Sequence, residues 1–121
     1  MDNHHYAMEL ADKADRAKRL GRMEEAKAFF KEAFDHESLA ALKLQNRNSV
    51  EPTRSILFRS AASLAIECEE LREAERMIAY GLIGMPPNEI AEELRDLLEK
   101  VNFQRHLRLR GVDNQRHAAK R

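Results

Sequence analysis

The chain has 121 residues, the size of one compact domain with no room for a second. Its 21 basic and 21 acidic side chains give a formal net charge of zero, which argues against a uniformly basic nucleic-acid-binding protein, and 35% charged residues argue against a membrane protein. The apolar fraction of 43% suffices for a core, but Trp is absent and Ala is frequent, so we expect that core to be thin and closely packed.

The cysteine count and the first residues indicate a compartment. Cys68 is the single cysteine, so the chain can form neither an intrachain disulfide nor a CxxC metal site. Residues 1–10 lack the basic start and apolar run of a signal peptide, and no apolar run approaches the roughly 20 residues that span a bilayer. We expect a cytoplasmic protein without a membrane segment.

The first half of the chain predicts an antiparallel helix pair over about 5–45. Small and apolar residues between Tyr6 and Leu20 recur at steps of three and four, which places them on one helical face. Gly21 interrupts this pattern, and the same period resumes at Met23. Residues 45–53 are rich in turn formers and include Pro52, which predicts a linker.

The second half predicts another pair over about 53–84. Residues 56–68 are apolar around more than half of a helix, so this element should be the most buried. Gly84 followed by two prolines predicts a helix end with the glycine in the left-handed conformation. A predicted capping helix over about 87–109 completes a domain over 1–110. Residues 111–121 are predicted to form a basic disordered tail.

A short motif occurs twice. The run from Leu20 through Ala26 matches the run from Cys68 through Ala74: a helix end, a tight turn, one apolar residue, then Glu-Ala. A large apolar residue follows four positions later, which is Phe30 in the first copy and Ile78 in the second. A small alanine at this place lets two antiparallel helices approach closely.

This motif resembles that of the tetratricopeptide repeat family, whose unit of about 34 residues is a helix pair. The matching residues are Leu10, Ala14, Gly21, Met23, Ala26, Phe30 and Ala33, and then Phe58, Ala62, Leu71, Ala74, Ile78, Gly81 and Pro86. Two departures are the 48 positions between Ala26 and Ala74 and the Lys13 that stands where the family usually has leucine. The resemblance implies an all-α fold of about five helices, two pairs plus the capping helix, as a fragment of a right-handed solenoid.

The resemblance also implies a concave groove, lined by the first helix of each pair, that holds a peptide or protein partner. Its register places the groove candidates at Ala11, Asp15, Lys18, Arg19, Arg59, Ser63, Ile66 and Glu67. The subgroup of the family that clamps a C-terminal carboxylate has asparagines where this chain has Asp15 and Ser63, which disfavours that activity. Because two repeats are few for a stable array, we expect an exposed side to pack on another copy or on a partner.

The sequence gives less support to a metal-binding or catalytic function than to partner binding. The five histidines are scattered, and Glu32 with His36 is a lone helical pair, so we expect neither a metal nor a cofactor. The chain has no phosphate-binding glycine loop and no nucleophile elbow, which indicates a non-enzymatic protein. Arg110 and His117 have the spacing of a helical ribonuclease motif, which leaves a remote nuclease alternative.

The zero net charge is a cancellation between two regions. Residues 1–101 carry 20 acidic and 15 basic side chains, whereas residues 102–121 carry one acidic and six basic ones. The basic residues are Arg105, Arg108, Arg110, Arg116, Lys120 and Arg121. This end can contact nucleic acid, fold back on the acidic second half, or only aid solubility. The leading hypothesis remains a protein-binding adaptor or assembly subunit, and a nucleic-acid accessory factor is the alternative.

Overall fold

The computed structural model describes residues 2–119, with side chains described for residues 2–111. Within that range the chain forms five α-helices and a short 3₁₀ helix without any strand, so the predicted all-helical class is confirmed. The bounds are α1 Asn3–Arg19, α2 Met23–Leu42, η1 Asn48–Val50, α3 Thr53–Glu67, α4 Leu71–Ile83 and α5 Asn88–Ala119. No helix of the described part is apolar over a length that would cross a bilayer.

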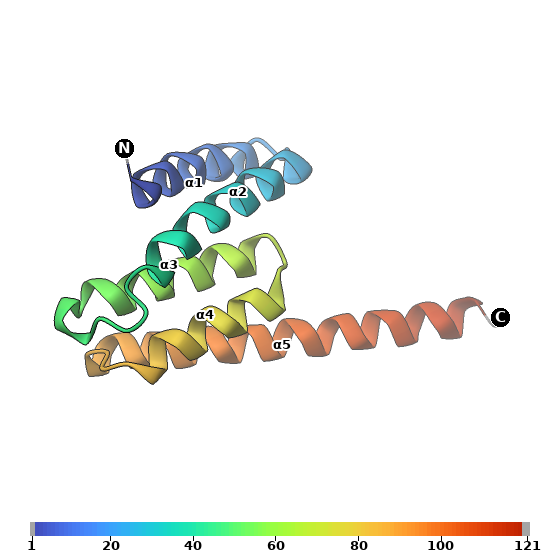
Figure 1. Ribbon diagram of the computed structural model, residues 1–121. Helices are drawn as coiled ribbons and strands as arrows, with labels where there is room; N and C mark the ends of the chain where they lie inside the picture. The colour runs from blue at the N-terminus through green and yellow to red at the C-terminus, as the bar shows by residue number, and fades with distance from the viewer. Residues whose placement is uncertain (1, 120–121) are drawn as a thin grey trace.

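The helices form two pairs that stack on one another, and α5 lies against the second pair (Figure 1). α1 packs on α2, α3 packs on α2 and α4, and α5 packs on α4 and α3. The sequence predicts α3 as the most buried element, and the structure confirms this, because nine of its 15 residues are buried. α3 is therefore the helix through which the two pairs and α5 are joined.

The same turn closes both pairs, and it explains the repeated motif. Gly21 and Glu69 occupy equivalent positions and both have a left-handed backbone, with φ of 76° and 64°. The next residues, Arg22 and Glu70, donate their backbone N–H groups to the carbonyls of Ala17 and Ala65, five residues earlier, at 2.9 and 2.8 Å. These are Schellman motifs, in which a left-handed residue ends a helix and satisfies its last carbonyls. The repeat is thus present in the backbone as well as in the sequence.

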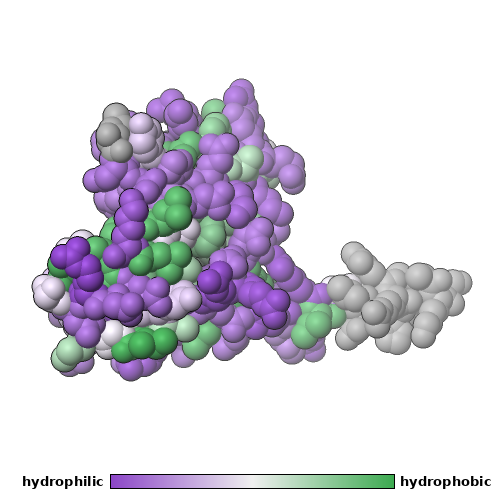
Figure 2. Space-filling view, viewed as in Figure 1, coloured by the Kyte–Doolittle hydropathy of each residue, from purple (hydrophilic) through white to green (hydrophobic). Residues whose placement is uncertain are grey.

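Small side chains form much of the core, as predicted. Ala26 and Ala74, the alanines of the repeated motif, are buried, and so are Phe30 and Ile78, which follow them by four residues. Hydrophilic residues dominate the face seen in Figure 2, and apolar side chains show between them. Because a side chain with one methyl group leaves little space between helix axes, the pairs pack closely without a large aromatic core.

One buried arginine joins the linker, α3 and the end of α4. Arg54 is 0% exposed, and its guanidinium lies over the Phe58 ring. The guanidinium donates to the carbonyls of Gln45, Tyr80 and Gly81 and to the carboxylate of Glu51. The bonds to Gly81 and Glu51 measure 2.7 and 3.0 Å. A cation at the last carbonyls of a helix also interacts favourably with the helix dipole, so Arg54 caps α4 from a neighbouring helix.

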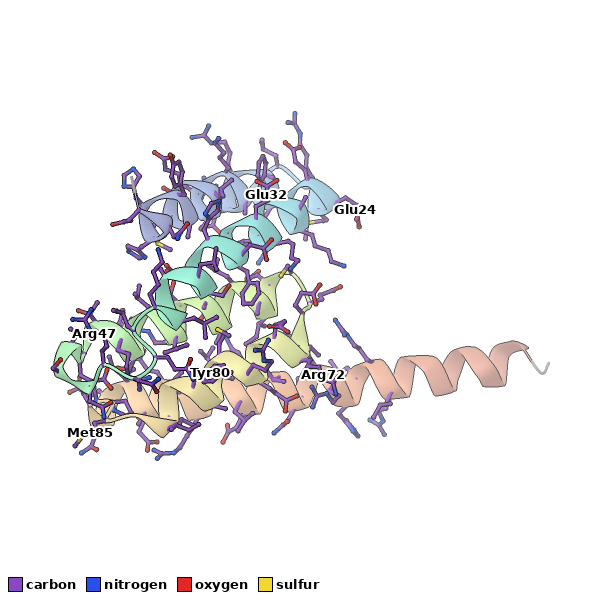
Figure 3. The ribbon with its side chains drawn as sticks, viewed as in Figure 1. Glu24, Glu32, Arg47, Arg72, Tyr80 and Met85 are labelled. Atoms are coloured by element: carbon purple, nitrogen blue, oxygen red, sulfur yellow. The ribbon has the colours of Figure 1, made fainter. Side chains whose placement is uncertain are left out.

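Glu51 completes this network from the linker. Its carboxylate accepts hydrogen bonds from the backbone N–H groups of Ser55 and Met85 as well as from Arg54. Figure 3 shows Arg47 of the same linker and Met85 of the α4–α5 connection at one end of the molecule. The Glu51–Arg54 pair therefore fixes both the start of α3 and the chain reversal before α5.

The expected left-handed conformation of Gly84 is wrong. Its φ is −75°, a value open to other residues. The glycine is needed instead because a Cβ atom at this position would lie 2.1 Å from Nη2 of Arg54. The absence of a side chain at Gly84 makes room for the guanidinium that caps α4.

The predicted end of the last helix also differs from the structure. α5 was expected to end near Leu109, but its bounds extend to Ala119, across most of the segment expected to be a disordered tail. A single glycine, Gly111, costs a helix interior only about 1 kcal/mol, and its neighbours are helix-compatible. Residues 120–121 of the expected tail lie outside the described range.

We expect Gly84→Ala to lower the free energy of unfolding by about 2 kcal/mol, because a methyl group displaces a guanidinium that is held by charge-assisted hydrogen bonds. Gly111→Ala is the matched control, since nothing lies within 4 Å of its added Cβ. It should leave stability unchanged or raise it by about 1 kcal/mol. Urea denaturation followed by circular dichroism measures both, and equal effects of the two substitutions would contradict the role given to Gly84.

The pH dependence of stability tests Glu51. Burial raises the pKa of the Glu51 carboxyl, but hydrogen bonds from Ser55 and Arg54 outweigh burial and hold the pKa below its usual 4.5. Because the folded-state pKa is the lower one, the carboxylate stabilises the fold above pH 4.5, and this stabilisation is lost as the pH falls through the folded value. Glu51→Gln should cost about 3 kcal/mol at neutral pH and flatten the stability profile below pH 5. An unchanged profile in denaturation at several pH values would refute this assignment.

Candidate functional site

A groove runs between α3 and α5 and reaches the end of α1. It consists of three adjoining hollows of about 420, 310 and 150 Å³, which share residues with one another. α1 contributes Lys18, α3 contributes Arg59, Ser63, Ile66 and Glu67, the turn contributes Glu69, and α5 contributes Glu93, Asp96, Leu97, Lys100, Gln104, Leu107 and Arg108. We call this surface the α3–α5 groove.

The floor of the groove is apolar and its rims are charged. Ile66 is buried and Leu97 is half-buried, and the Ser63 hydroxyl lies beside them on α3. Two ion pairs join different helices along the rims: Lys18 of α1 meets Glu67 of α3 at 3.1 Å, and Arg59 of α3 meets Glu93 of α5. The arrangement offers an apolar strip with paired charges of both signs on either side.

Five of the groove candidates named from the sequence lie together in this groove, namely Lys18, Arg59, Ser63, Ile66 and Glu67. Ile66 belongs to the core as much as to the groove, since it is only 8% exposed. Asp15 and Arg19 are exposed on α1 and do not line the groove. The structure thus brings the α3 candidates together with one residue of α1.

The α5 wall is the part that the sequence reasoning missed. The fifth helix was treated as a solvating cap, yet one of its faces forms half of the groove. Its lining residues follow one another at steps of three and four: Glu93, Leu97, Lys100, Gln104 and Leu107. This spacing places them on a single helical face, so the signal was in the sequence, but it gave no indication of what that face lies against.

The basic residues of the C-terminal region divide into two groups. Arg105 pairs with Glu75 of α4, and Arg108 donates to the Glu69 carbonyl at 2.7 Å. These contacts agree with the alternative in which the basic end folds back on the acidic second pair. Arg110 is exposed on α5. The side chain of Arg116 and the residues Lys120 and Arg121 lie outside those that the structure describes.

Two histidines, His4 and His36, take part in contacts between α1 and α2. α1 begins at Asn3, earlier than expected, and the Asp2 side chain accepts from the His5 backbone N–H at 2.8 Å as a helix cap. His4 hydrogen-bonds with the carboxylate of Glu37, which is 0% exposed and also accepts from Ser60 at 2.6 Å. This chain of contacts joins α1, α2 and α3. Neither Glu37 nor Arg54 was recognised from the sequence, because nothing local in it distinguishes a buried charge from a surface one.

Neither a metal centre nor a catalytic cluster emerges from these contacts. Among residues 2–111, no group of three His, Cys, Asp or Glu side chains is placed to hold a metal ion. Ser60 donates to Glu37 rather than to a histidine, so it lacks the adjacent base that activates a serine nucleophile. The nuclease pair named from the sequence cannot be assembled from described side chains, because that of His117 lies outside them.

The chain was compared with protein-family models, with curated proteins and with solved structures, and none of them matches. The likeness to tetratricopeptide repeats therefore rests on the residues and the repeated turn described above.

The reactivity of Cys68 gives a test of the packing behind the groove. Cys68 is 3% exposed, and burial raises the pKa of its thiol, so both access and thiolate content are low. We expect a disulfide reagent to label native protein at least about 100 times more slowly than protein in urea, because labelling requires opening of the core. Comparable rates in the two conditions would show that the α3–α4 turn is open in solution.

Proposed function

We propose that this protein is a non-enzymatic interaction module, an adaptor or assembly subunit that holds a segment of a partner protein in the α3–α5 groove. The observation that carries the proposal is the groove itself, with an apolar floor at Ile66 and Leu97 between rims of paired charges. Apolar floors supply affinity and charged rims supply orientation in protein interfaces. The resemblance to tetratricopeptide repeats supports the same use.

The dimensions of the groove suit a short peptide. On α5 its lining extends from Glu93 to Arg108, about four helical turns or roughly 22 Å. An extended strand of about seven residues or a helix of about four turns covers this length. Lys18 and Arg59 already form ion pairs with carboxylates. A partner whose charges are all of one sign therefore gains little from these two cations. A peptide with apolar residues and few charges fits this surface best.

The nucleic-acid alternative receives less support. Arg105 and Arg108 are engaged with the second pair, which reduces the positive charge offered to phosphates. The test of this alternative is RNA and DNA binding at two salt concentrations. A steep loss of affinity with salt that depends on residues 111–121 would favour nucleic acid over the groove proposal.

Selection from a displayed peptide library, followed by calorimetry on the chosen peptide, tests the groove. Ser63→Trp should lower peptide affinity at least about tenfold, since an indole fills the centre of the groove. Ala79→Trp is the control, because Ala79 is a small exposed residue on α4 that does not line the groove. It should leave the affinity within about twofold of the parent. Equal affinity for the parent and both variants would place the binding site elsewhere.

A further inference from the structure

The side of α5 that faces away from the body carries a second surface, which shares only Asp96 with the groove. Residues Glu92, Asp96, Glu99, Phe103, His106 and Arg110 follow one another at alternating steps of four and three, and all are exposed. Such spacing places them in one stripe along the helix. We call these six residues the outer stripe.

Nothing in the described chain covers the outer stripe. The buried residues of α5 that pack on the body, among them Ile90, Leu94 and Val101, occupy the opposite side of the helix by the 3.6-residue period. α5 also continues beyond the stacked helices as a free arm (Figure 1). The phenyl ring of Phe103 is 63% exposed, and Leu107 beside it is 49% exposed. Large exposed apolar side chains grouped on one helix face mark a contact surface.

The charges of the outer stripe change sign at this apolar centre. Asp96 and Glu99 precede Phe103 by up to two helical turns, and Arg110 follows it by two turns. A helix that approaches in the opposite direction with the same sequence therefore presents Arg110 to the acidic half and its own acidic half to Arg110. A two-fold axis makes each such contact twice. In an antiparallel pair the stripe is therefore complementary to itself at Glu99 and Arg110, on both sides of the apolar centre.

We propose that a second copy of this chain binds the outer stripe, with the two α5 helices antiparallel across a two-fold axis between Phe103 and His106. In this register the ring of Phe103 packs on the second copy's His106 and Leu107. Glu99, one turn before Phe103, lies opposite Arg110, one turn after His106. A uniformly acidic or basic partner matches only half of the stripe, which is why a second copy is favoured over such a partner.

The position of α5 in the fold supports the same occupant. Within the described chain α5 is the outermost helix of the stack, and an outermost helix needs a polar outer face to remain free in solution. The outer stripe meets this need at its acidic start but not at Phe103. Pairing two such ends covers both phenyl rings with one contact. This surface adjoins the α3–α5 groove at Asp96 and Leu107, but its centre at Phe103 and its ion pair of Glu99 with Arg110 lie outside the groove, so the dimer does not require a bound peptide.

The oligomeric state of the full chain tests the proposal. Sedimentation equilibrium should give a concentration-dependent mass that approaches twice that of the chain. Phe103→Ser should raise the dimer dissociation constant at least about tenfold, since each copy loses a buried ring. Leu109→Ser is the matched control, because Leu109 is also 63% exposed and lies on another face of the same helix. It should leave the dissociation constant within about twofold, and circular dichroism should show both variants folded.

Charge reversal tests the register independently of the apolar contact. Arg110→Glu should weaken the dimer about fivefold, because two symmetric ion pairs are lost. Adding Glu99→Arg to it restores opposite charges and should return the dissociation constant to within about twofold of the parent. A monomer at millimolar concentration would overturn the proposal. Equal effects of Phe103→Ser and Leu109→Ser, or no recovery in the double variant, would overturn it as well.

Discussion

The buried guanidinium of Arg54 is the interaction on which the arrangement of the helices most depends. A charge removed from water must be compensated, and here a carboxylate and three backbone carbonyls, from the linker and from the end of α4, supply the compensation. These acceptors are far apart in sequence and meet only when the linker, α3 and the end of α4 are in place. The cost of leaving the charge without partners therefore penalises other arrangements of the two helix pairs.

At the other end of the molecule, Glu69 has a related role. It adopts the left-handed backbone that Gly21 adopts in the first pair, although a residue with a Cβ atom does so less readily. Its side chain binds Lys27 of α2 at 3.0 Å, and its carbonyl accepts from Arg108 of α5. Lys27 also lowers the pKa of the Glu69 carboxyl, by its hydrogen bond and its charge. A glycine at this turn would form it more easily but would lose the contact with α2.

Local sequence patterns were sufficient to predict the helices, but they did not predict the tertiary contacts that join the helices. The period of small and apolar residues predicted five helices, and the repeated motif identified two turns of the same kind. Gly84 shows where local reasoning ends, because the glycine is needed for an arginine 30 positions away rather than for its own backbone. In the same way, three-residue and four-residue steps marked a face of α5, but only tertiary structure shows that α3 lies across from it. The α3 residues of the groove were predicted because the repeated motif gave their register. The α5 residues were not predicted, because α5 is not part of a repeat to which it could be aligned.

The two networks together hold α3 at both of its ends, by Arg54 and Glu51 at the start and by the Schellman turn at Glu69 at the finish. α3 is also one wall of the groove, so this wall is already ordered before anything enters it. Under the proposed function, a partner segment would meet a surface whose backbone loses little conformational entropy on binding, so most of the entropic cost of association would fall on the partner. For a flexible peptide, such a rigid wall favours selection by shape and makes the affinity depend strongly on how ordered the free peptide is.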